Sequence, residues 1–442
     1  MTNFQFDPKL MAAMLEWTGQ RILGGPDPKH GAQSFNQLEP VLGSSISDDG
    51  IGGEAAFALF TDTIVPSTRP FGHPTSLSFV ASAPSKAALS FDAALGAAGI
   101  FAGNWDGGAG AIHAENQALA WLATLAGWDE KAGGVFVAGG TLGNLSALHT
   151  ARNWKTRRSA RAERWAILCS TEAHSSIEAV SEVMDVDLIR VPTDASGRLD
   201  ATAAQRAITP NVFAIVANAG ATNCGAVDDI AGLADLAEAQ DVWLHLDGAY
   251  GLAALADPKT RREFAGIERA DSFIVDPHKW LFAPYDSCAL VYRDASHAAR
   301  AHGQAAEYLD VVDKNHWNPS DYALHLTRRA RGLPLWFSLA THGTQAYGQA
   351  VADTIRIAQE LADGIAAMPG VDLILGPQLS VILFRPVQMT DAEMEAWAET
   401  QRRSGALLCL PTSWQGQKVF RLCIVNPETN AKGILAVLET LK

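Results

Sequence analysis

Short apolar runs alternate with segments of helical periodicity through the middle of the chain. A short apolar run bounded by turn residues is typical of a strand buried on both faces of a sheet. Between these runs, apolar residues recur at helical spacing, as on a helix that packs against a sheet. The pattern predicts strands at 133–137, 165–169, 187–191, 213–218, 242–247, 273–276 and 288–292, with helices at 115–126, 144–160, 175–184 and 230–239. Strands that alternate with helices indicate an α/β fold with a mostly parallel central sheet.

The pattern changes towards both ends of the chain. Near the N-terminus it predicts an amphipathic helix at 8–23, a loop at 24–50 and a helix near 53–61. Such a helix at a terminus must dock on the main domain or on a second subunit. Near the C-terminus it predicts helices at 345–368, 391–403 and 431–441, with strands near 373, at 380–385 and at 419–425. We therefore expect three parts: an N-terminal helical segment over 1–75, a large domain over 76–340 and a small α+β domain over 341–442.

Composition and charge narrow the class of protein. The 442 residues are 48% hydrophobic and carry a net charge of −14, which is typical of a folded globular protein and argues against nucleic acid or an anionic membrane as partner. The basic residues between 155 and 161 are read as a solvated helix face. No apolar run approaches the roughly 20 residues that span a bilayer.

The cysteines and the N-terminus indicate a reducing compartment. The five cysteines, an odd number, are far apart, and none has Cys-x-x-Cys spacing, so we expect reduced thiols. The first residues lack a basic start followed by an apolar core. We therefore expect a cytoplasmic protein. No cluster of histidine, cysteine and aspartate has metal-ligand spacing, so no metal is expected.

The candidate chemistry centres on Lys279, which follows the apolar run 273–275 and the turn at Pro277. A solvated lysine at a strand end is the bland interpretation, because lysine is normally a surface residue. The sharper interpretation is a Schiff-base lysine whose amine becomes nucleophilic through partial desolvation. Asp247 ends another apolar run, and a buried carboxylate needs a cationic partner or a metal. An amine for an aldehyde and a carboxylate for a pyridinium nitrogen are the two protein groups that pyridoxal 5'-phosphate (PLP) requires.

Two weaker signals lie upstream. Gly139, Gly140 and Thr141 form a turn between a predicted strand and a predicted helix, where backbone N–H groups could bind an anion. A tight turn needs glycines in any case, so this motif alone does not specify a phosphate site. His174 follows a strand among small polar residues, where its ring could stack on a cofactor, although a lone histidine is more often structural. Supporting roles for His245 and His278 remain open.

Six motifs in order resemble the group II PLP-dependent amino-acid decarboxylases, the family that includes the aromatic L-amino-acid, glutamate and diaminobutyrate decarboxylases. They are AGGTLGNLSALHTAR (138–152), STEAHSSIEAV (170–180), NAGATNCGAVDDI (218–230), WLHLDGAYG (243–251), ADSFIVDPHKWL (270–281) and TRRARGLPLW (327–336). Each motif is modest alone, and the ordered set is specific. The resemblance implies a fold-type I, aspartate-aminotransferase-like homodimer with active sites at the subunit interface, where the N-terminal segment docks.

The resemblance also implies roles for individual residues. Lys279 matches the aldimine lysine, Asp247 the carboxylate that keeps the pyridinium nitrogen protonated, and His174 the histidine that stacks on the ring. Ala249 would pack on the opposite face of the ring and Thr222 would lie near the ring oxygen. Matches at the phosphate are Gly140, Thr141 and His278, and matches in the substrate pocket are Phe79, Val80 and Tyr250. Lys279, His174 and Asp247 are thus the expected catalytic residues.

The chain departs from the family pattern in two places. The segment GAGAIHAEN (108–116) stands where the family has Ser-Pro-Ala before an acid, on the substrate side. Tyr322 lies in the region of the tyrosine that reprotonates the carbanion in the aromatic enzymes, although nearer to the Arg328–Arg329 pair than in the family pattern.

We therefore expect decarboxylation of an L-amino acid to its amine through a Lys279 aldimine. Phe79 and Tyr250 favour an aromatic or apolar side chain. The alternatives are a PLP-dependent carbon–carbon lyase, an aldehyde synthase on the same scaffold, or a non-catalytic PLP-fold binding protein. Intact Lys279, Asp247 and His174 argue against the last of these.

Overall fold

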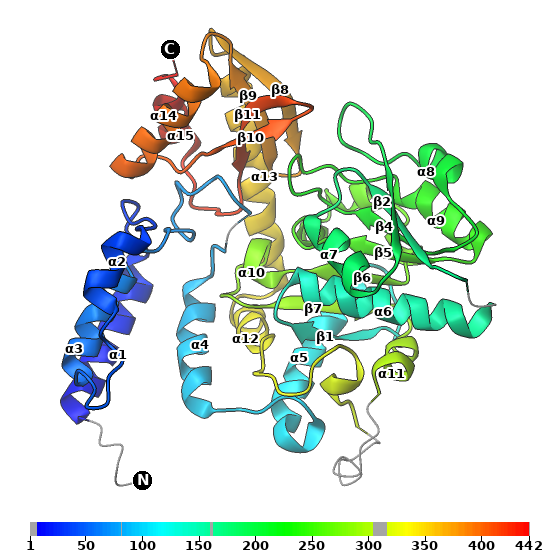
Figure 1. Ribbon diagram of the computed structural model, residues 1–442, viewed down its shortest axis with the longest axis horizontal. Helices are drawn as coiled ribbons and strands as arrows, with labels where there is room; N and C mark the ends of the chain where they lie inside the picture. The colour runs from blue at the N-terminus through cyan, green and yellow to red at the C-terminus, as the bar shows by residue number, and fades with distance from the viewer. Residues whose placement is uncertain (1–6, 81, 160–161, 304–315, 442) are drawn as a thin grey trace.

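The computed structural model describes residues 7–80, 82–159, 162–303 and 316–441. Its centre is a seven-stranded sheet in the order β1-β7-β6-β5-β4-β2-β3 (Figure 1). The strands are β1 (Gly133–Val137), β2 (Ala166–Ser170), β3 (Asp187–Val191), β4 (Val212–Asn218), β5 (Trp243–Asp247), β6 (Ser272–Val275) and β7 (Cys288–Tyr292). Only β7 runs antiparallel to its neighbours β1 and β6. The predicted α/β fold with a mostly parallel sheet is confirmed.

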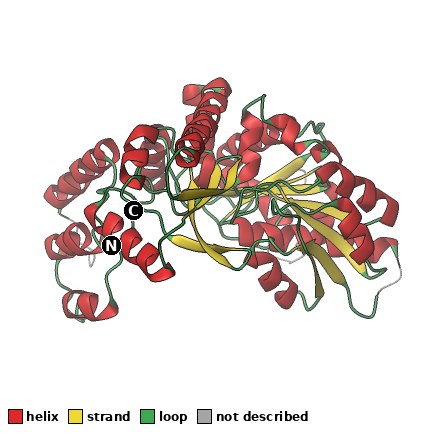
Figure 2. Ribbon diagram, turned by 90° about the horizontal axis from the view of Figure 1, so that it is seen from above, coloured by secondary structure: helices red, strands yellow, loops and turns green. Residues whose placement is uncertain are grey.

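Helices cover both faces of this sheet (Figure 2). Successive residues of a strand point to opposite faces, and β4 shows the consequence. Val216 joins the core cluster that contains residues of α6 and α7, whereas Ile215 joins the cluster that contains residues of α5 and α9. The helices of the large domain are α5 (Trp105–Leu125), α6 (Gly140–Arg158), α7 (Ser175–Val183), α8 (Ala201–Ala207), α9 (Ile230–Gln240), α10 (Pro277–Trp280), α11 (Ser296–His302) and α12 (Leu333–His342). Short 3-10 turns lie at Gly251–Ala256, Arg261–Phe264, Ile267–Arg269 and Pro319–Asp321.

A second, antiparallel sheet forms the core of the C-terminal part. Its order is β10-β11-β9-β8, and its strands are β8 (Val371–Gln378), β9 (Val381–Pro386), β10 (Pro411–Trp414) and β11 (Gln417–Cys423). The helices are α13 (Thr344–Ala366), α14 (Asp391–Ser404) and α15 (Ala431–Leu438). Thr390 and Glu393 form a capping box that begins α14, and Gly405 ends it in the left-handed conformation. The predicted α+β arrangement is confirmed, with β10 as an additional strand.

The N-terminal segment lies beside the rest of the chain, at the left of Figure 1. It contains α1 (Pro8–Gly24), α2 (Phe35–Leu42), α3 (Gly53–Leu59) and the π-helical turn η1 (Phe60–Ile64). None of these four elements contains a buried residue. The prediction of a continuous loop over 24–50 is wrong, because Ser34 and Gln37 form a capping box that begins α2.

Helices α4 (Lys86–Ala98), α5 and α6 differ from what the sequence predicted. Helix α4, whose first turn is capped by Ser85, was not predicted. Helix α5 begins at Trp105, ten residues before the predicted start, because Asn104 caps it and Asn318 accepts a hydrogen bond from the Trp105 N–H. The glycines in its first turns hide this start, since glycine disfavours a helix. Helix α6 likewise begins earlier, at Gly140.

Two further findings bear on the environment of the protein. All five cysteines are buried and free, as predicted. Within the described ranges, no helix is both long and apolar enough to cross a membrane.

Candidate active site

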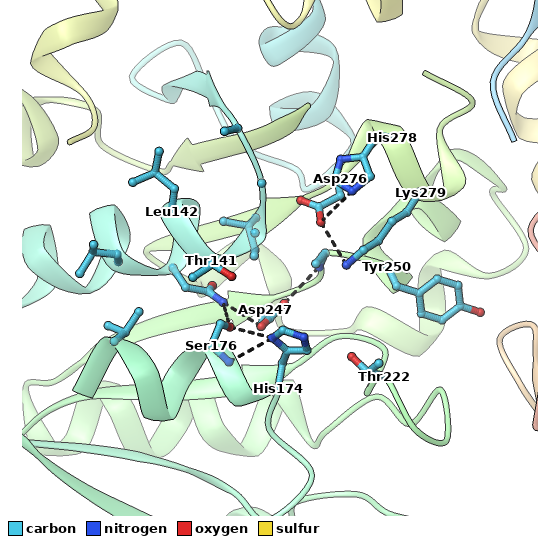
Figure 3. Close-up of a pocket in the computed structure, with 18 of the residues that line it drawn as sticks. Thr141, Leu142, His174, Ser176, Thr222, Asp247, Tyr250, Asp276, His278 and Lys279 are labelled. Carbon is cyan, nitrogen blue, oxygen red and sulfur yellow. Dashed lines mark hydrogen bonds and ion pairs between the residues drawn. The ribbon is translucent and has the colours of Figure 1, made fainter. Parts of the chain in front are cut away.

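A pocket of about 600 Å³ lies at the carboxyl ends of the parallel strands, where ligands bind in sheets of this type (Figure 3). Residues after β1, β2, β4, β5 and β6 all reach it, because parallel strands end at the same edge. The polar and charged lining residues are Thr141, Asn144, His174, Ser176, Asn218, Thr222, Asp247, Tyr250, Asp276, His278, Lys279, Tyr285 and Asp286. Residues from Ala138 to Asp286, far apart in the sequence, therefore share one cavity.

Lys279 lies on the helical turn α10, directly after β6. Its Nζ is 3.0 Å from Oδ2 of Asp276, a carboxylate that is only 2% exposed. Burial lowers the pKa of Lys279, but the carboxylates of Asp276 and Asp247 raise it, and the net direction is upward. The net upward direction of the Lys279 pKa runs against the expectation that partial desolvation makes the amine nucleophilic. In the cofactor-free chain, Asp276 holds Lys279 as an ammonium ion.

Asp247 lies at the end of β5 and faces the same pocket. Its Oδ2 accepts a hydrogen bond from the Asn144 side-chain amide at 2.9 Å, and its Oδ1 accepts one from the Ala249 N–H at 3.2 Å. Asn144 also donates to Ser176 Oγ at 3.0 Å. A carboxylate that is bonded on both oxygens has a fixed orientation.

His174 caps the N-terminus of α7 with its own ring. The Nδ1 atom accepts a hydrogen bond from the Ser176 N–H at 3.1 Å and lies 2.9 Å from Ser176 Oγ. Both contacts are drawn in Figure 3. Because Nδ1 is engaged in the cap, the Nε2 edge of the ring is left to face other groups.

The first turn of α6 lines one end of the pocket with groups that could bind an anion. The N-cap residue Gly139 has no side chain to cap this turn, and the first N–H groups of an α-helix have no partner within the helix. A Cβ at Gly140 would lie 3.2 Å from Ile274 Cδ1 and 3.4 Å from Asp276 Oδ2, so a side chain there would crowd the cavity. His278 donates from Nδ1 to the Ser287 carbonyl at 2.7 Å, and burial lowers the pKa of its ring.

Comparison with known proteins places the chain in a family. The pyridoxal-dependent decarboxylase conserved domain matches residues 54–387, which is more than half of the chain. This chain belongs to the pyridoxal-dependent decarboxylase family. It is therefore a PLP-dependent carboxy-lyase, and its reaction class is amino-acid decarboxylation.

Two curated relatives of this decarboxylase extend over most of both chains. Aromatic-L-amino-acid decarboxylase of Bacillus atrophaeus is 29% identical over 424 residues, which cover 92% of this chain and 88% of the relative. L-2,4-diaminobutyrate decarboxylase of Rhizobium meliloti (strain 1021) is 28% identical over 429 residues, with coverage of 92% and 86%. The crystal structure of Oryza sativa TDC with PLP and tryptamine superimposes with a TM-score of 0.90 at 21% identity, covering 99% of this chain and 98% of the other. The fold is thus that of the PLP decarboxylases.

The residues of the decarboxylase pocket fit PLP chemically. An amine, a carboxylate and an uncapped helix N-terminus face one cavity, and these groups complement the aldehyde, ring nitrogen and phosphate of PLP. The predicted cofactor residues all line this cavity: Lys279, Asp247, His174, Gly140, Thr141, Thr222, Ala249 and His278. Across the described ranges, no group of three or more histidine, cysteine or acidic residues could hold a metal ion.

The four predicted substrate-pocket residues are not brought together. Tyr250 lines the cavity, but its hydroxyl contacts Ser380 and its ring stacks on Trp280 with centroids 4.9 Å apart. Of the residues that the structure describes, Phe79, Val80 and Tyr322 are not among those lining the cavity of their own chain. The assignment of these three residues to the substrate pocket therefore stays a prediction, since the resemblance places that pocket at a subunit interface.

The positions of these three residues have physical causes. Phe79 is 38% exposed and contacts the ring of Phe71, whereas Val80 packs on the core of the large sheet. Tyr322 stacks on Trp317 with ring centroids 3.9 Å apart, and burial raises its pKa to about 12. Val80 and Tyr322 thus pack against apolar side chains outside the cavity of their own chain.

Three polar residues of the site escaped the sequence analysis: Asp276, Asn144 and Ser176. A signal for Asp276 was present, because it stands three residues before Lys279 and side chains at this spacing meet on a helical turn. Asn144 and Ser176 are ordinary helix residues in the sequence, and only tertiary packing of α6 brings Asn144 to Ser176 of α7 and to Asp247 at the end of β5.

Proposed function

We propose that this decarboxylase converts an aromatic L-amino acid to the corresponding amine and CO₂, with PLP bound covalently through Lys279. The convergence of Lys279, Asp247 and His174 on one cavity beside the uncapped start of α6 carries the proposal. Bound PLP supplies an electron sink for the electron pair that remains when CO₂ leaves. Every other part of the proposed mechanism belongs to side chains and backbone N–H groups of this protein.

Each proposed role follows from the position of a side chain. Asp247 holds a proton on the ring nitrogen of PLP, because a carboxylate fixed on both oxygens stabilises the adjacent cation. His174 lies against the ring and orients the substrate carboxylate through its Nε2 edge. Asp276 accepts the proton of Lys279 and returns it when the lysine is free again. The N–H groups at Gly140 and Thr141, with His278, bind the phosphate.

The lining of the cavity supports an aromatic or apolar substrate side chain. Besides the polar groups, it contains Leu142, Leu145, Ala179, Val180 and Val183. Among the described residues that line it, none is an arginine, the usual partner of an acidic side chain. The relative from Bacillus atrophaeus is named as an aromatic-L-amino-acid decarboxylase.

We further propose a cytoplasmic homodimer in which Phe79 reaches the cavity of the second subunit. Phe79 is exposed although it is a large aromatic residue, and it lies outside the cavity of its own chain. The N-terminal helices lack buried residues and need a surface to cover them. The proposed parts are the segment 1–75, which docks on the partner, the large domain 76–340 and the small domain 341–442.

The experiment that tests the proposal is product analysis of the purified, PLP-loaded protein with the common L-amino acids. CO₂, amine, ammonia and peroxide are measured together. We expect CO₂ with an equal amount of an aromatic amine. Ammonia and peroxide in place of amine would overturn amine formation in favour of an aldehyde synthase, and a carbon–carbon cleavage product without CO₂ would favour a lyase.

Two lysines that each pair with an aspartate provide the test of the attachment site. Lys279→Met should abolish the visible absorbance of covalently bound PLP and the release of CO₂. Lys155→Met is the matched control, because Lys155 is also paired with an aspartate, Asp241, but lies outside the cavity. Retention of the absorbance in Lys279→Met would show that PLP is attached elsewhere.

A further inference from the structure

A chain of hydrogen bonds runs from the core of the large sheet to the cavity. The Trp243 indole N–H donates to Ser272 Oγ at 2.8 Å, and Ser272 Oγ lies 2.8 Å from Nδ1 of His245. His245 Nε2 lies 2.9 Å from Oδ1 of Asn144. The Asn144 amide nitrogen then branches to Asp247 and Ser176. Of these six residues, Asp247 is the one that was assigned a chemical role above.

The direction of every bond in this chain follows from Asp247. An ionised carboxylate only accepts hydrogen bonds, so Asn144 must turn its NH₂ group towards Asp247. Its carbonyl oxygen therefore faces His245, and Nε2 of that ring must carry a proton. Nδ1 of His245 is then bare and accepts the hydroxyl proton of Ser272, while Trp243, which can only donate, binds the hydroxyl oxygen.

The charge state of His245 agrees with this direction. The ring is completely buried, and burial lowers its pKa to about 4 in spite of the opposing effects of Asp247 and Ser272. A neutral ring has one donor and one acceptor, which is what the two neighbours require. A single arrangement of protons therefore gives a partner to each donor and acceptor in the hydrogen bonds that link Trp243 to Asp247.

The second branch of the chain orients His174. Asn144 donates to Ser176 Oγ, so the Ser176 hydroxyl proton is free to point at Nδ1 of His174. Nδ1 also accepts the Ser176 backbone N–H. With two donors aimed at Nδ1, the ring proton of His174 must lie on Nε2, the edge that faces away from the cap.

We propose that Asn144 is a positioning residue that couples Asp247 to His174. Its single amide group fixes the orientation of the Asp247 carboxylate and, through Ser176, the proton position on the His174 ring. The buried residues His245, Ser272 and Trp243 hold this amide in the one orientation that serves both. The inference rests on the roles proposed above for Asp247 and His174.

The test uses Ser272, which lies in β6 and is not among the lining residues of the cavity. Ser272→Ala removes the donor to His245, so that ring can take the other tautomer and Asn144 loses its fixed orientation. In the PLP-loaded protein we expect the pH at which the visible absorbance changes to shift by about 0.5–1 pH unit. Ser272→Thr keeps the hydroxyl and should restore the wild-type transition. An unchanged transition in Ser272→Ala overturns the coupling.

A double-mutant cycle tests the link through Asn144. Asn144→Ser removes both amide donors and should shift the same transition by about 1–2 pH units, because one acceptor is charged. Ser176→Ala alone should shift it by about 0.5 pH unit, and should add nothing in the Asn144→Ser background. Additive shifts would mean that Ser176 acts without Asn144 and would overturn the proposal.

A control and a separate readout keep this test distinct from the test of function. Ser181 is in the same helix as Ser176, is equally buried and donates only to the Glu178 carbonyl, so Ser181→Ala should leave the transition unchanged. The dissociation constant of PLP, measured by titrating the cofactor-free protein, should rise about tenfold in Asn144→Ser. If the wild-type protein fails to attach PLP, the proposed function fails. If it attaches PLP and all variants titrate like the wild type with equal affinity, only the coupling fails.

Discussion

The wall of the cavity around Asp247 and the N-terminal helices are stabilised in opposite ways. At the wall, polar side chains are buried and bonded to one another, as in the chain from Trp243 through Asn144 to Asp247. In the N-terminal helices the polar residues are solvated and large apolar side chains are exposed, with Leu15 at 65% and Leu23 at 71%. The polar side chains of the wall find their hydrogen-bond partners within one chain, whereas the large apolar side chains of the N-terminal helices are left uncovered by that chain.

This difference separates the chemistry that one chain can perform from the contacts that a second copy would supply in the proposed dimer. A satisfied polar network in the core keeps one geometry, because each rearrangement would leave a buried group unbonded. Exposed apolar helices gain stability only when another surface covers them. We therefore expect substitutions at the wall to change chemistry and substitutions in the N-terminal helices to change assembly.

The largest expected effect lies at Asp247. Asp247→Ala should lower kcat by about 10²–10³-fold, because the proton on the ring nitrogen loses its counter-charge. Covalent attachment of PLP to Lys279 should persist in the absorbance spectrum. Asp257 is the matched control, since it is as exposed as Asp247, at 7%, but caps a turn outside the cavity. If Asp257→Asn lowers kcat as much as Asp247→Ala, the loss at Asp247 reflects general destabilisation.

The second prediction concerns the exposed helix α1. Leu15→Asp combined with Leu23→Asp should convert the dimer to monomers, because each carboxylate would be buried at the proposed interface without a partner. Sedimentation velocity measures the conversion, and specific activity should fall with it at least tenfold at low protein concentration. Thr18→Asp and Gln20→Asp, at a half-buried and an exposed polar position of the same helix, should leave the proposed dimer intact. A stable dimer in the first variant would place the subunit interface elsewhere.

The difference between buried strands and exposed helices also explains which features could be predicted from the sequence. The strands β4 and β5 are buried along their whole length, so their apolar runs are visible in the sequence, and so are Asp247 and Lys279 at strand ends. Helix α2 was missed because it lies in a segment rich in glycine, proline and serine and contains Pro40, whereas its start is set by a local capping box. The early start of α5 was hidden by its glycines and fixed by a distant residue, Asn318.

The polar residues behind the site were harder to predict for a different reason. Asn144 and Ser176 gain their roles from the packing of α6 beside α7, and this contact has no periodicity in the sequence. Tyr322 was expected near the substrate because of its place in the chain. Its ring stacks on Trp317, outside the cavity of its own chain. Sequence patterns therefore identify groups at strand ends better than groups that meet across helices.

The third prediction concerns how the free energy of unfolding changes at low pH because of the buried residue His245. Burial lowers the pKa of His245 from 6.5 to about 4, so the unfolded chain binds a proton that the folded chain does not bind. Stability should therefore fall as the pH drops from 6.5 to about 4, by on the order of 2–3 kcal/mol from this group. His245→Gln should flatten the fall, as measured by urea unfolding at several pH values.

The buried carboxyl group of Asp228 changes the stability in the opposite direction as the pH falls. Burial raises the pKa of Asp228 from 3.8 to about 7, so the folded chain binds a proton there between these values and gains stability as the pH falls. The difference between the wild type and His245→Gln isolates the histidine contribution, because Asp228 is present in both. A constant difference across the pH range would show that His245 titrates equally in the folded and unfolded chains.

The smallest expected effect concerns the pairing of Lys279 with Asp276. Asp276 raises the pKa of Lys279 against the effect of burial, so Asp276→Asn should lower the pH at which the amine loses its proton. We expect the midpoint for covalent attachment of PLP to the cofactor-free protein to fall by about one pH unit. At a fixed pH below that midpoint, attachment should then be up to about tenfold faster.

Asp286 provides the control for this last comparison. It lines the same cavity but pairs with Arg331, so Asp286→Asn changes the charge of the cavity without removing the partner of Lys279. Stopped-flow absorbance over a range of pH values measures both variants. Equal shifts would mean that total charge controls the lysine. A shift only in Asp276→Asn would mean that a carboxylate at 3.0 Å keeps Lys279 charged until PLP arrives.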